Sequence, residues 1–265
     1  MSSSNQSNGV KMKKVALAVA VVLGLVVVQP VQASDNKVLV IIDTAIDSTK
    51  VPVLHEVCFT AKTCPNGTSF QEGPGAANVS NWSVRGIDHG HNIAQAAINS
   101  APDVKIIFIR ISDLNVFKTS SSMHTAGASM ANAIRWVSEN SEKYGIDAVS
   151  ISQSRINFAV GTCPTDVVFS SAVQVLKAKN ILTYAATGND ARTNQVGFPS
   201  CVADVVGVGA TKPSGGLASY TNSGPGMDIT FIGNYNVKSY KGADITITGT
   251  SVAAPMAAAK SVSLK

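Results

Sequence analysis

The sequence is poor in charge and in aromatic side chains: charged residues make up 14% of its 265 positions and aromatic residues 6%. Disordered chains and coiled coils carry far more charge than this, so both classes are excluded. The apolar share of 45% is typical of a globular chain, and the length suits one large domain. The sequence shows neither an internal repeat nor a second domain.

The sequence also lacks an apolar run long enough for a typical membrane span, which needs about 20 residues. The candidate run, residues 15–28, follows three lysines and precedes the stretch "VQPVQA", which ends in small residues. This pattern predicts a cleaved export signal over residues 1–33, with an uncleaved anchor as the alternative. No cysteine follows the expected cut before Ser34, so we expect no lipid anchor, and Met12 is an alternative start.

A basic surface is lacking once this signal is removed. Three of the 21 basic residues and none of the 16 acidic residues lie in residues 1–33, so the net charge falls from +5 to +2. No basic run remains, which argues against nucleic-acid binding. We therefore expect a secreted or periplasmic monomer that binds neither nucleic acid nor, after signal cleavage, the membrane.

The four cysteines show no Cys-x-x-Cys and no Cys/His spacing, which argues against a zinc site. In an exported chain they favour disulfides, and four cysteines allow three pairings. Cys58 and Cys64 flank a short loop rich in turn-forming residues, so they could close it locally. Cys163 and Cys201 would then pair with each other across a strand and a helix.

Apolar, β-branched runs alternate with helical patterns along the chain. Strands are expected at residues 37–43, 104–112, 147–154, 180–189 and 202–211, and helices at 90–101, 127–144, 166–179 and 251–260. Strands that are apolar throughout are typical of a sheet buried on both faces, and strand–helix alternation indicates parallel crossovers. We predict an α/β fold for residues 34–265: a doubly wound, mostly parallel sheet with helices on both faces. Residues 58–85 are expected to form a surface loop.

Three polar residues stand where such a sheet places its chemistry, beyond the carboxyl ends of the strands. Asp43 closes the first expected strand, where an aspartate is commonly a turn or capping residue. His89 begins a helix, where a surface role, or a metal role together with His91, is the alternative. Ser251 opens the last helix, where serine is an ordinary N-cap. Each residue alone is a weak signal.

Together the three residues form a set with chemical meaning. A serine hydroxyl is a poor nucleophile until a base removes its proton, and histidine is the usual base near neutral pH. The histidine in turn needs a carboxylate that fixes its tautomer and stabilises its cation. The chain order Asp, His, Ser is one of several that this triad adopts on unrelated folds.

Three motifs carry a resemblance to a known family. "VIIDTAID" resembles the Asp motif of subtilisin-like serine peptidases, "HGHNIA" resembles their His motif, and "GTSVAAP" is similar to their Ser motif. The resemblance runs from about residue 37 to 259. It implies a serine endopeptidase that acts on polypeptides without a cofactor, with Asp43, His89 and Ser251 as the catalytic triad. His91 and Asn92 replace a Thr-His pair of the family that orients rather than reacts, so His89 remains the expected base.

The resemblance also implies further site residues. In "YAATGND" it gives the side-chain amide of Asn189 the role of oxyanion donor, against the plain alternative of a turn residue. Family members usually have glycine where Ser154 stands, so a narrower or more polar pocket is expected. The segments around Cys163 and Cys201 resemble secreted bacterial members whose cysteines pair, and the calcium-binding insertion after the His motif is missing, so we expect no metal site. The implied substrate-binding residues are Ser152, Gln153, Ser154, Ala186, Thr187 and Gly188.

Two other functions remain as alternatives. One is a catalytically weak pseudo-protease that binds peptides, and the other is a metal-dependent hydrolase using Asp88, His89 and His91, which lacks a ligand-rich partner motif. Family members also carry a prodomain and continue further beyond the Ser motif. On this basis we expect a C-terminally short fold of marginal stability and weak activity.

Overall fold

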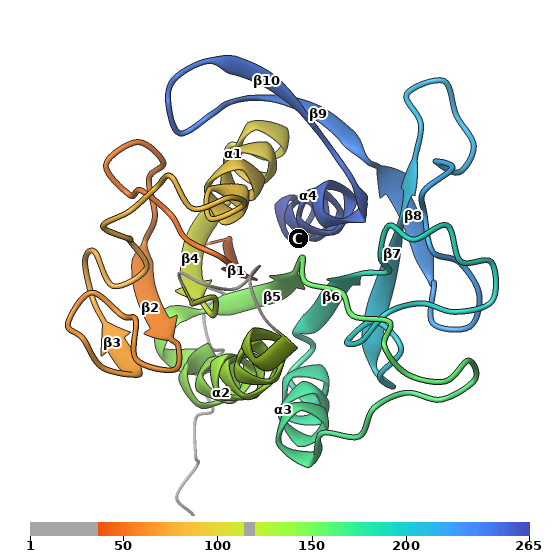
Figure 1. The fold of residues 1–265 in the computed structure, drawn as a ribbon, viewed down its shortest axis with the longest axis horizontal. Helices are drawn as coiled ribbons and strands as arrows, with labels where there is room; N and C mark the ends of the chain where they lie inside the picture. Colours follow the sequence, from red (N-terminus) through yellow and green to blue (C-terminus); the bar gives the residue numbers. More distant parts are fainter. Residues whose placement is uncertain (1–36, 114–119) are drawn as a thin grey trace, which may run out of the picture. The chain divides into compact units, whose positions relative to one another are not determined.

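The computed structural model describes residues 37–113 and 120–265, and of residues 120–127 only the backbone. The expected signal over residues 1–33 lies outside the described part. The described chain is built on an eight-stranded sheet with the order β3-β2-β4-β1-β5-β6-β7-β8 (Figure 1). Its strands are β1 (Val38–Asp43), β2 (His55–Phe59), β3 (Phe70–Glu72), β4 (Lys105–Arg110), β5 (Ile146–Ile151), β6 (Leu182–Ala186), β7 (Val205–Thr211) and β8 (Ile229–Ile232).

All neighbouring strands of this sheet run parallel except β2 and β3, which are antiparallel. Helices α1 and α4 lie on one face of the sheet and helices α2 and α3 on the other (Figure 1). The α/β fold with a mostly parallel sheet between two helical layers is therefore confirmed. The helices are α1 (His89–Ser100), α2 (Ser120–Tyr144), α3 (Val167–Ala178) and α4 (Thr250–Ser263).

Strand β1 shows why the apolar runs form this sheet. All six of its residues are buried, and successive side chains point to opposite faces. Leu39 and Ile41 join the core beneath α1 and α4, whereas Val40 and Ile42 join the core beneath α2 and α3. Strands β2 to β4 lie on one side of β1 and β5 to β8 on the other, so the strand order changes direction at β1. The carboxyl end of a strand at such a point is the usual place for a ligand-binding site.

A separate two-stranded antiparallel sheet precedes the last helix. Its strands, β9 (Asn234–Lys238) and β10 (Asp244–Thr248), form a hairpin that arches past α1 and leads into α4 (Figure 1). Gln95 of α1 donates to the carbonyl of Lys238 and accepts from its N–H, which ties the hairpin to that helix. No helix within the described ranges is long and apolar enough to cross a membrane.

The expected surface loop at residues 58–85 is wrong in part, because β2 continues to Phe59 and β3 lies within it. Neither strand has an apolar run of its own: β3 has three residues, and it forms only by pairing with β2 at the sheet edge. β8 and β9 were not predicted either, and α2 begins seven residues before its expected start at 127. These elements depend on partners far away in the sequence, which local patterns do not reveal.

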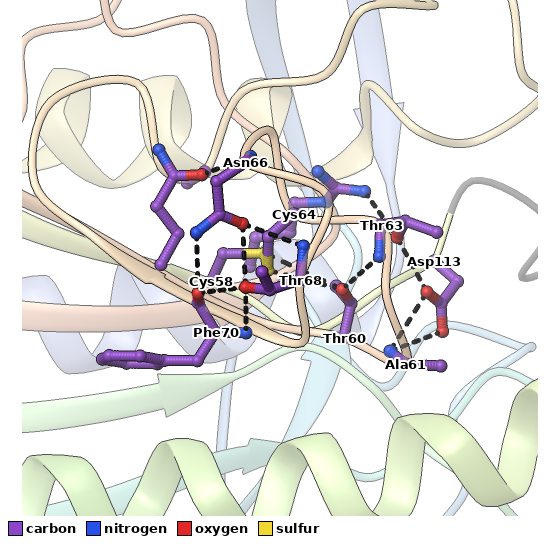
Figure 2. The surroundings of a disulfide bond; sticks show 12 residues. Cys58, Thr60, Ala61, Thr63, Cys64, Asn66, Thr68, Phe70 and Asp113 are labelled. Carbon is purple, nitrogen blue, oxygen red and sulfur yellow. Dashed lines mark hydrogen bonds between the residues drawn. A yellow bond between two sulfur atoms is a disulfide. The ribbon is translucent and has the colours of Figure 1, made fainter.

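Both expected cysteine pairs, Cys58–Cys64 and Cys163–Cys201, are bonded in the structure, and the described residues include no free cysteine. Figure 2 shows the first pair, which joins Cys58 of β2 to Cys64 in the loop between β2 and β3. The carboxylate of Asp113 accepts hydrogen bonds from the backbone N–H of Ala61 and from the hydroxyl of Thr63 (Figure 2). The loop is therefore held both to itself and to the segment that follows β4.

Candidate active site

Asp43 is the last residue of β1 and its side chain is completely buried. Its Oδ1 accepts a hydrogen bond from the backbone N–H of Thr44, at 2.6 Å, and lies 2.8 Å from Nδ1 of His89. Since a carboxylate only accepts, Nδ1 of His89 carries the proton and Nε2 is left free to act as a base. Asp43 and His89, which stand 46 positions apart, are thus brought together as expected.

The start of α1 is fastened to the residue that follows Asp43. Thr44 donates its hydroxyl to the carbonyl of Ile87 and accepts from the N–H of Gly90, both at 2.8 Å. These bonds replace a side-chain cap, since the N-cap residue Asp88 makes none. Thr44 was not predicted as a site residue, although its place directly after Asp43 is a usable signal.

Gly90 allows α1 to approach β1 closely. A Cβ at this position would lie 2.6 Å from the ring of Phe108, closer than real contacts allow, and 3.0 Å from Cβ of Asp43, closer than most. With any larger residue there, either the helix or the ring of Phe108 would have to shift. The absence of a side chain at 90 therefore sets the distance between His89 and the sheet.

The surroundings of His89 favour its protonated form. Burial of the imidazole opposes protonation, but the charge of Asp43, the hydrogen bond to Asp43 and the charge of Asp88 outweigh it. The pKa of His89 consequently lies above its ordinary value of 6.5. This is the electrostatic arrangement that a general base needs, because the cation formed after proton transfer is stabilised.

His91 has a different environment and a structural role. It is buried, its Nδ1 accepts from the backbone N–H of Asp47, and its ring lies edge-on to Trp82 and Tyr240. Burial lowers the pKa of His91 below the ordinary value. Among the side chains that the structure describes, those of residues 37–113 and 128–265, no three His, Cys, Asp or Glu are grouped as metal ligands, so the metal-dependent hydrolase built on Asp88, His89 and His91 is not supported.

Ser251 is the second residue of α4 and is 8% exposed. The expectation that it could be an ordinary N-cap is wrong, because the N-cap is Gly249. Gly249 has a φ of 149°, in the region that favours glycine, and turns the chain sharply from β10 into the helix. Ser152, directly after β5, supports the helix start by donating its hydroxyl to the carbonyl of Ser251, at 3.0 Å.

Asn189 is bound to the same helix start. Its Oδ1 accepts from the backbone N–H of Thr250 at 2.9 Å and from the Thr250 hydroxyl at 3.0 Å. This fixes the orientation of the amide and leaves Nδ2 without a hydrogen-bond partner among the described residues. A Cβ placed on Gly249 would lie 3.0 Å from Oγ of Ser251 and 3.2 Å from Nδ2 of Asn189, so both atoms border the same small volume.

Two further residues that were not predicted from the sequence make hydrogen bonds to the segment around Asn189. The buried side chain of Asn222 donates to the carbonyl of Thr187 and accepts from the N–H groups of Asp190 and Arg192. Thr250 accepts from the N–H of Gly188 through its hydroxyl. Thr250 stands inside the Ser motif, which could have identified it, whereas Asn222 lies outside any recognised motif and 30 to 35 residues from its partners.

The expected substrate-binding residues form two adjacent segments at the carboxyl ends of β5 and β6, which pair in parallel. One segment is Ser152, Gln153 and Ser154, and the other is Ala186, Thr187 and Gly188. Ser154 is exposed, Gln153 is half-buried, and the other four are buried.

One expected contact is not made. No hydrogen bond joins Oγ of Ser251 to His89, although both lie in the described part of the chain and their helices α1 and α4 pack side by side (Figure 1). Catalytic hydrogen bonds are often long in a protein without substrate, so the lack of a hydrogen bond here does not remove either residue from the candidate site.

Sequence comparisons identify proteases as relatives of this chain. Subtilisin-like protease 3 of Pseudogymnoascus destructans is 27% identical over 226 residues, which cover 84% of this chain and 50% of that protein. Alkaline elastase YaB of a Bacillus species is 27% identical over 71% of this chain and 46% of its own length. The chain thus spans about half the length of these two relatives.

Solved structures share the fold. The protease domain of PatA superposes with a TM-score of 0.67 at 18% identity, covering 86% of this chain and 78% of that one. A protease from Pseudoalteromonas arctica superposes with a TM-score of 0.66 at 19% identity, covering 88% and 78%. The model of the subtilase family matches residues 34–265. Because this model matches most of the chain, the chain belongs to the subtilase family.

Proposed function

We propose that this chain is a serine endopeptidase that hydrolyses polypeptides through an acyl-enzyme. In this proposal Asp43, His89 and Ser251 are the triad, and Asn189 supplies one donor to the oxyanion. Residues 34–265 form the catalytic domain.

The proposed reaction uses only groups already described. Nε2 of His89 takes the proton of Ser251 as Oγ attacks the substrate carbonyl carbon, and Asp43 stabilises the resulting imidazolium. The negative oxygen is held by Nδ2 of Asn189 and by the backbone N–H of Ser251, which has no intrahelical acceptor so near the helix start. His89 then protonates the leaving amine, and water releases the acyl group by the same steps in reverse.

The observation that carries this proposal is the convergence of Oγ of Ser251 and Nδ2 of Asn189 on one point. A binding protein has no need to fix an amide beside a hydroxyl, whereas acyl transfer requires both groups within reach of one carbonyl. The complete set of four residues does not favour the pseudo-protease alternative.

The proposal is tested with a serine-directed phosphonate probe that becomes covalently attached to an activated hydroxyl. We expect labelling of the full chain at Ser251, shown by peptide mapping, and no labelling after Ser251→Ala. Single Ser251→Ala, His89→Ala and Asp43→Ala variants should each lose nearly all peptidase activity, and the triple variant little more, because the three act as one unit.

His91→Ala is the matched control, since it removes a neighbouring imidazole of the same helix. It should retain labelling at Ser251. If His91→Ala proved as damaging as His89→Ala, or if Ser251→Ala were still labelled, the proposed roles would be wrong.

We also infer that the chain acts outside the cytoplasm on polypeptides, as a monomer that binds no nucleic acid. The two disulfides support an oxidising compartment. N-terminal sequencing of the exported chain should begin at Ser34, and an intact N-terminus would argue against signal cleavage.

A further inference from the structure

The side chain of Ser154 lies between two glycines beside the proposed site. A Cβ built on Gly197 would lie 2.0 Å from Oγ of Ser154, and one built on Gly188 would lie 2.9 Å from the same atom. The hydroxyl therefore already takes the space that faces both glycines. It has no hydrogen-bond partner among the backbone and side-chain atoms that the structure describes, so none of these places it there by a polar contact.

This space is next to the reacting groups. Gly188 directly precedes Asn189, and Ser152, two residues before Ser154, bonds to the backbone of Ser251. In the proposed reaction the leaving amine must face His89, which lies on the β1 side of the sheet. The substrate residue that forms the acyl group consequently faces β5 and β6, where Ser154 and Gly188 stand.

The backbone around the space is tied in place. The N–H of Gly197 donates to the carbonyl of Thr187 at 2.8 Å, and Arg155 and Phe198 exchange backbone hydrogen bonds at 3.0 and 2.7 Å. Asn222 holds the carbonyl of Thr187 from the other side. These hydrogen bonds oppose the separation of the two segments that the entry of a large side chain would require.

We propose that Ser154 partly fills the pocket for the substrate residue that becomes the acyl group, so that the enzyme cleaves after small residues (glycine, alanine or serine) and rejects large apolar and aromatic ones. This inference rests on the proposed function for the identity of the site, but it concerns the shape of the pocket. Excluding a few carbon atoms from a rigid pocket changes specificity by about 10 to 200-fold for each step in size.

The catalytic test compares two peptide p-nitroanilides that are identical except for alanine or phenylalanine before the scissile bond. For the wild type, kcat/KM should favour alanine by at least about tenfold. Ser154→Gly should reduce this ratio by about tenfold or more, and Ser154→Ala, which keeps Cβ, should reduce it less. The ratio within one variant is independent of how much of the preparation is active.

A binding test separates failure of the pocket from failure of the chemistry. Binding of product peptides that end in alanine or phenylalanine is measured by fluorescence anisotropy. The two proteins compared are the Ser251→Ala variant and the double variant that also carries Ser154→Gly. A preference for the alanine peptide that Ser154→Gly removes supports the pocket even if the wild type hydrolyses nothing, an outcome that would refute only the proposed function.

The matched control is Ser214→Gly, at an exposed serine in another turn. It should leave both ratios unchanged. An unaltered preference in Ser154→Gly, a wild type that favours phenylalanine, or no binding of either peptide would each overturn the proposal.

Discussion

At the scale of the residue, Asn189 combines two tasks in one amide. Its oxygen accepts hydrogen bonds at the start of α4, and in the proposed function its nitrogen donates to the substrate oxyanion. Asn189→Ala should lower kcat by about 10²–10³, the usual effect of losing one oxyanion donor. It should also lower stability by about 1 kcal/mol, the usual effect of losing a cap.

Asn189→Asp distinguishes the two tasks, because it keeps an acceptor for Thr250 and removes the donor. It should lose activity like the alanine variant while its melting temperature stays near that of the wild type. Equal activity of Asn189→Asp and wild type would exclude the amide from catalysis. Asn194→Ala, at an exposed asparagine nearby, is the control and should change neither quantity.

The pKa values of the two histidines of α1 should be shifted in opposite directions from the ordinary value. Because Asp43 raises the pKa of His89 and burial lowers that of His91, NMR should show His89 titrating above 6.5 and His91 below it. A protonated imidazole cannot accept the serine proton. Activity should therefore rise as the pH rises through the pKa of His89 and show no step at that of His91.

Asp43→Asn provides the check on this assignment. Removing the carboxylate charge should shift the titration of His89 to lower pH and leave that of His91 nearly unchanged. A kcat/KM profile whose acid limb follows His91 would mean that the base has been assigned to the wrong residue.

At the scale of the element, the contact of α1 with the sheet depends on Gly90. Gly90→Ala should destabilise the protein by about 1–3 kcal/mol, the usual range for overpacking. It should also reduce peptidase activity, because the helix must move away and take His89 from Asp43. Chemical denaturation and kcat/KM measure the two effects.

Phe108→Leu replaces the ring that Ala at position 90 would strike by a shorter side chain. The double variant should therefore lose less free energy of unfolding than the sum of the two single losses. Additive losses in this double-mutant cycle would mean that the ring is not the obstacle. The cycle uses equilibrium unfolding, so it does not depend on the proposed activity.

The disulfides should contribute according to the loops they close. Cys163–Cys201 spans 38 positions and Cys58–Cys64 spans 6, which correspond to about 4 and about 2 kcal/mol in the chain-entropy model. Urea unfolding of two variants, each with both cysteines of one disulfide replaced by serine, measures how much free energy of unfolding each disulfide contributes. A larger loss from the short loop would show that local contacts, such as those of Asp113, outweigh chain entropy.

At the scale of the whole molecule, the parts that could be predicted are those encoded by long local patterns. The strand ending at Asp43 is an unbroken apolar run because both of its faces are covered, and such runs are visible without any alignment. The triad residues could be proposed because their motifs follow or open these elements. The layered fold and the pairing of Asp43 with His89 follow from the same signals.

The parts that could not be predicted depend on distant partners. The three residues of β3 form a strand only beside β2, and Asn222 acts only because the loop at Thr187 comes to lie against it. Ser154 could be recognised as unusual, but that its hydroxyl faces Gly188 and Gly197 follows from the folded backbone alone. Side-chain positions between segments are thus the least accessible part of the site.

The central place of β1 and its contact with α4 also set an order of events while the chain is made. Asp43 lies near the start of the described chain and Ser251 near its end, yet both belong to elements that pack together. Contacts of such long sequence separation form late, and synthesis proceeds from the N-terminus. In the proposed function, a growing chain therefore holds the aspartate, the base and the amide donor before it has the nucleophile. Peptidase activity then requires that Ser251 has been synthesised and that α4 has packed against the sheet, so shorter lengths of the growing chain have none.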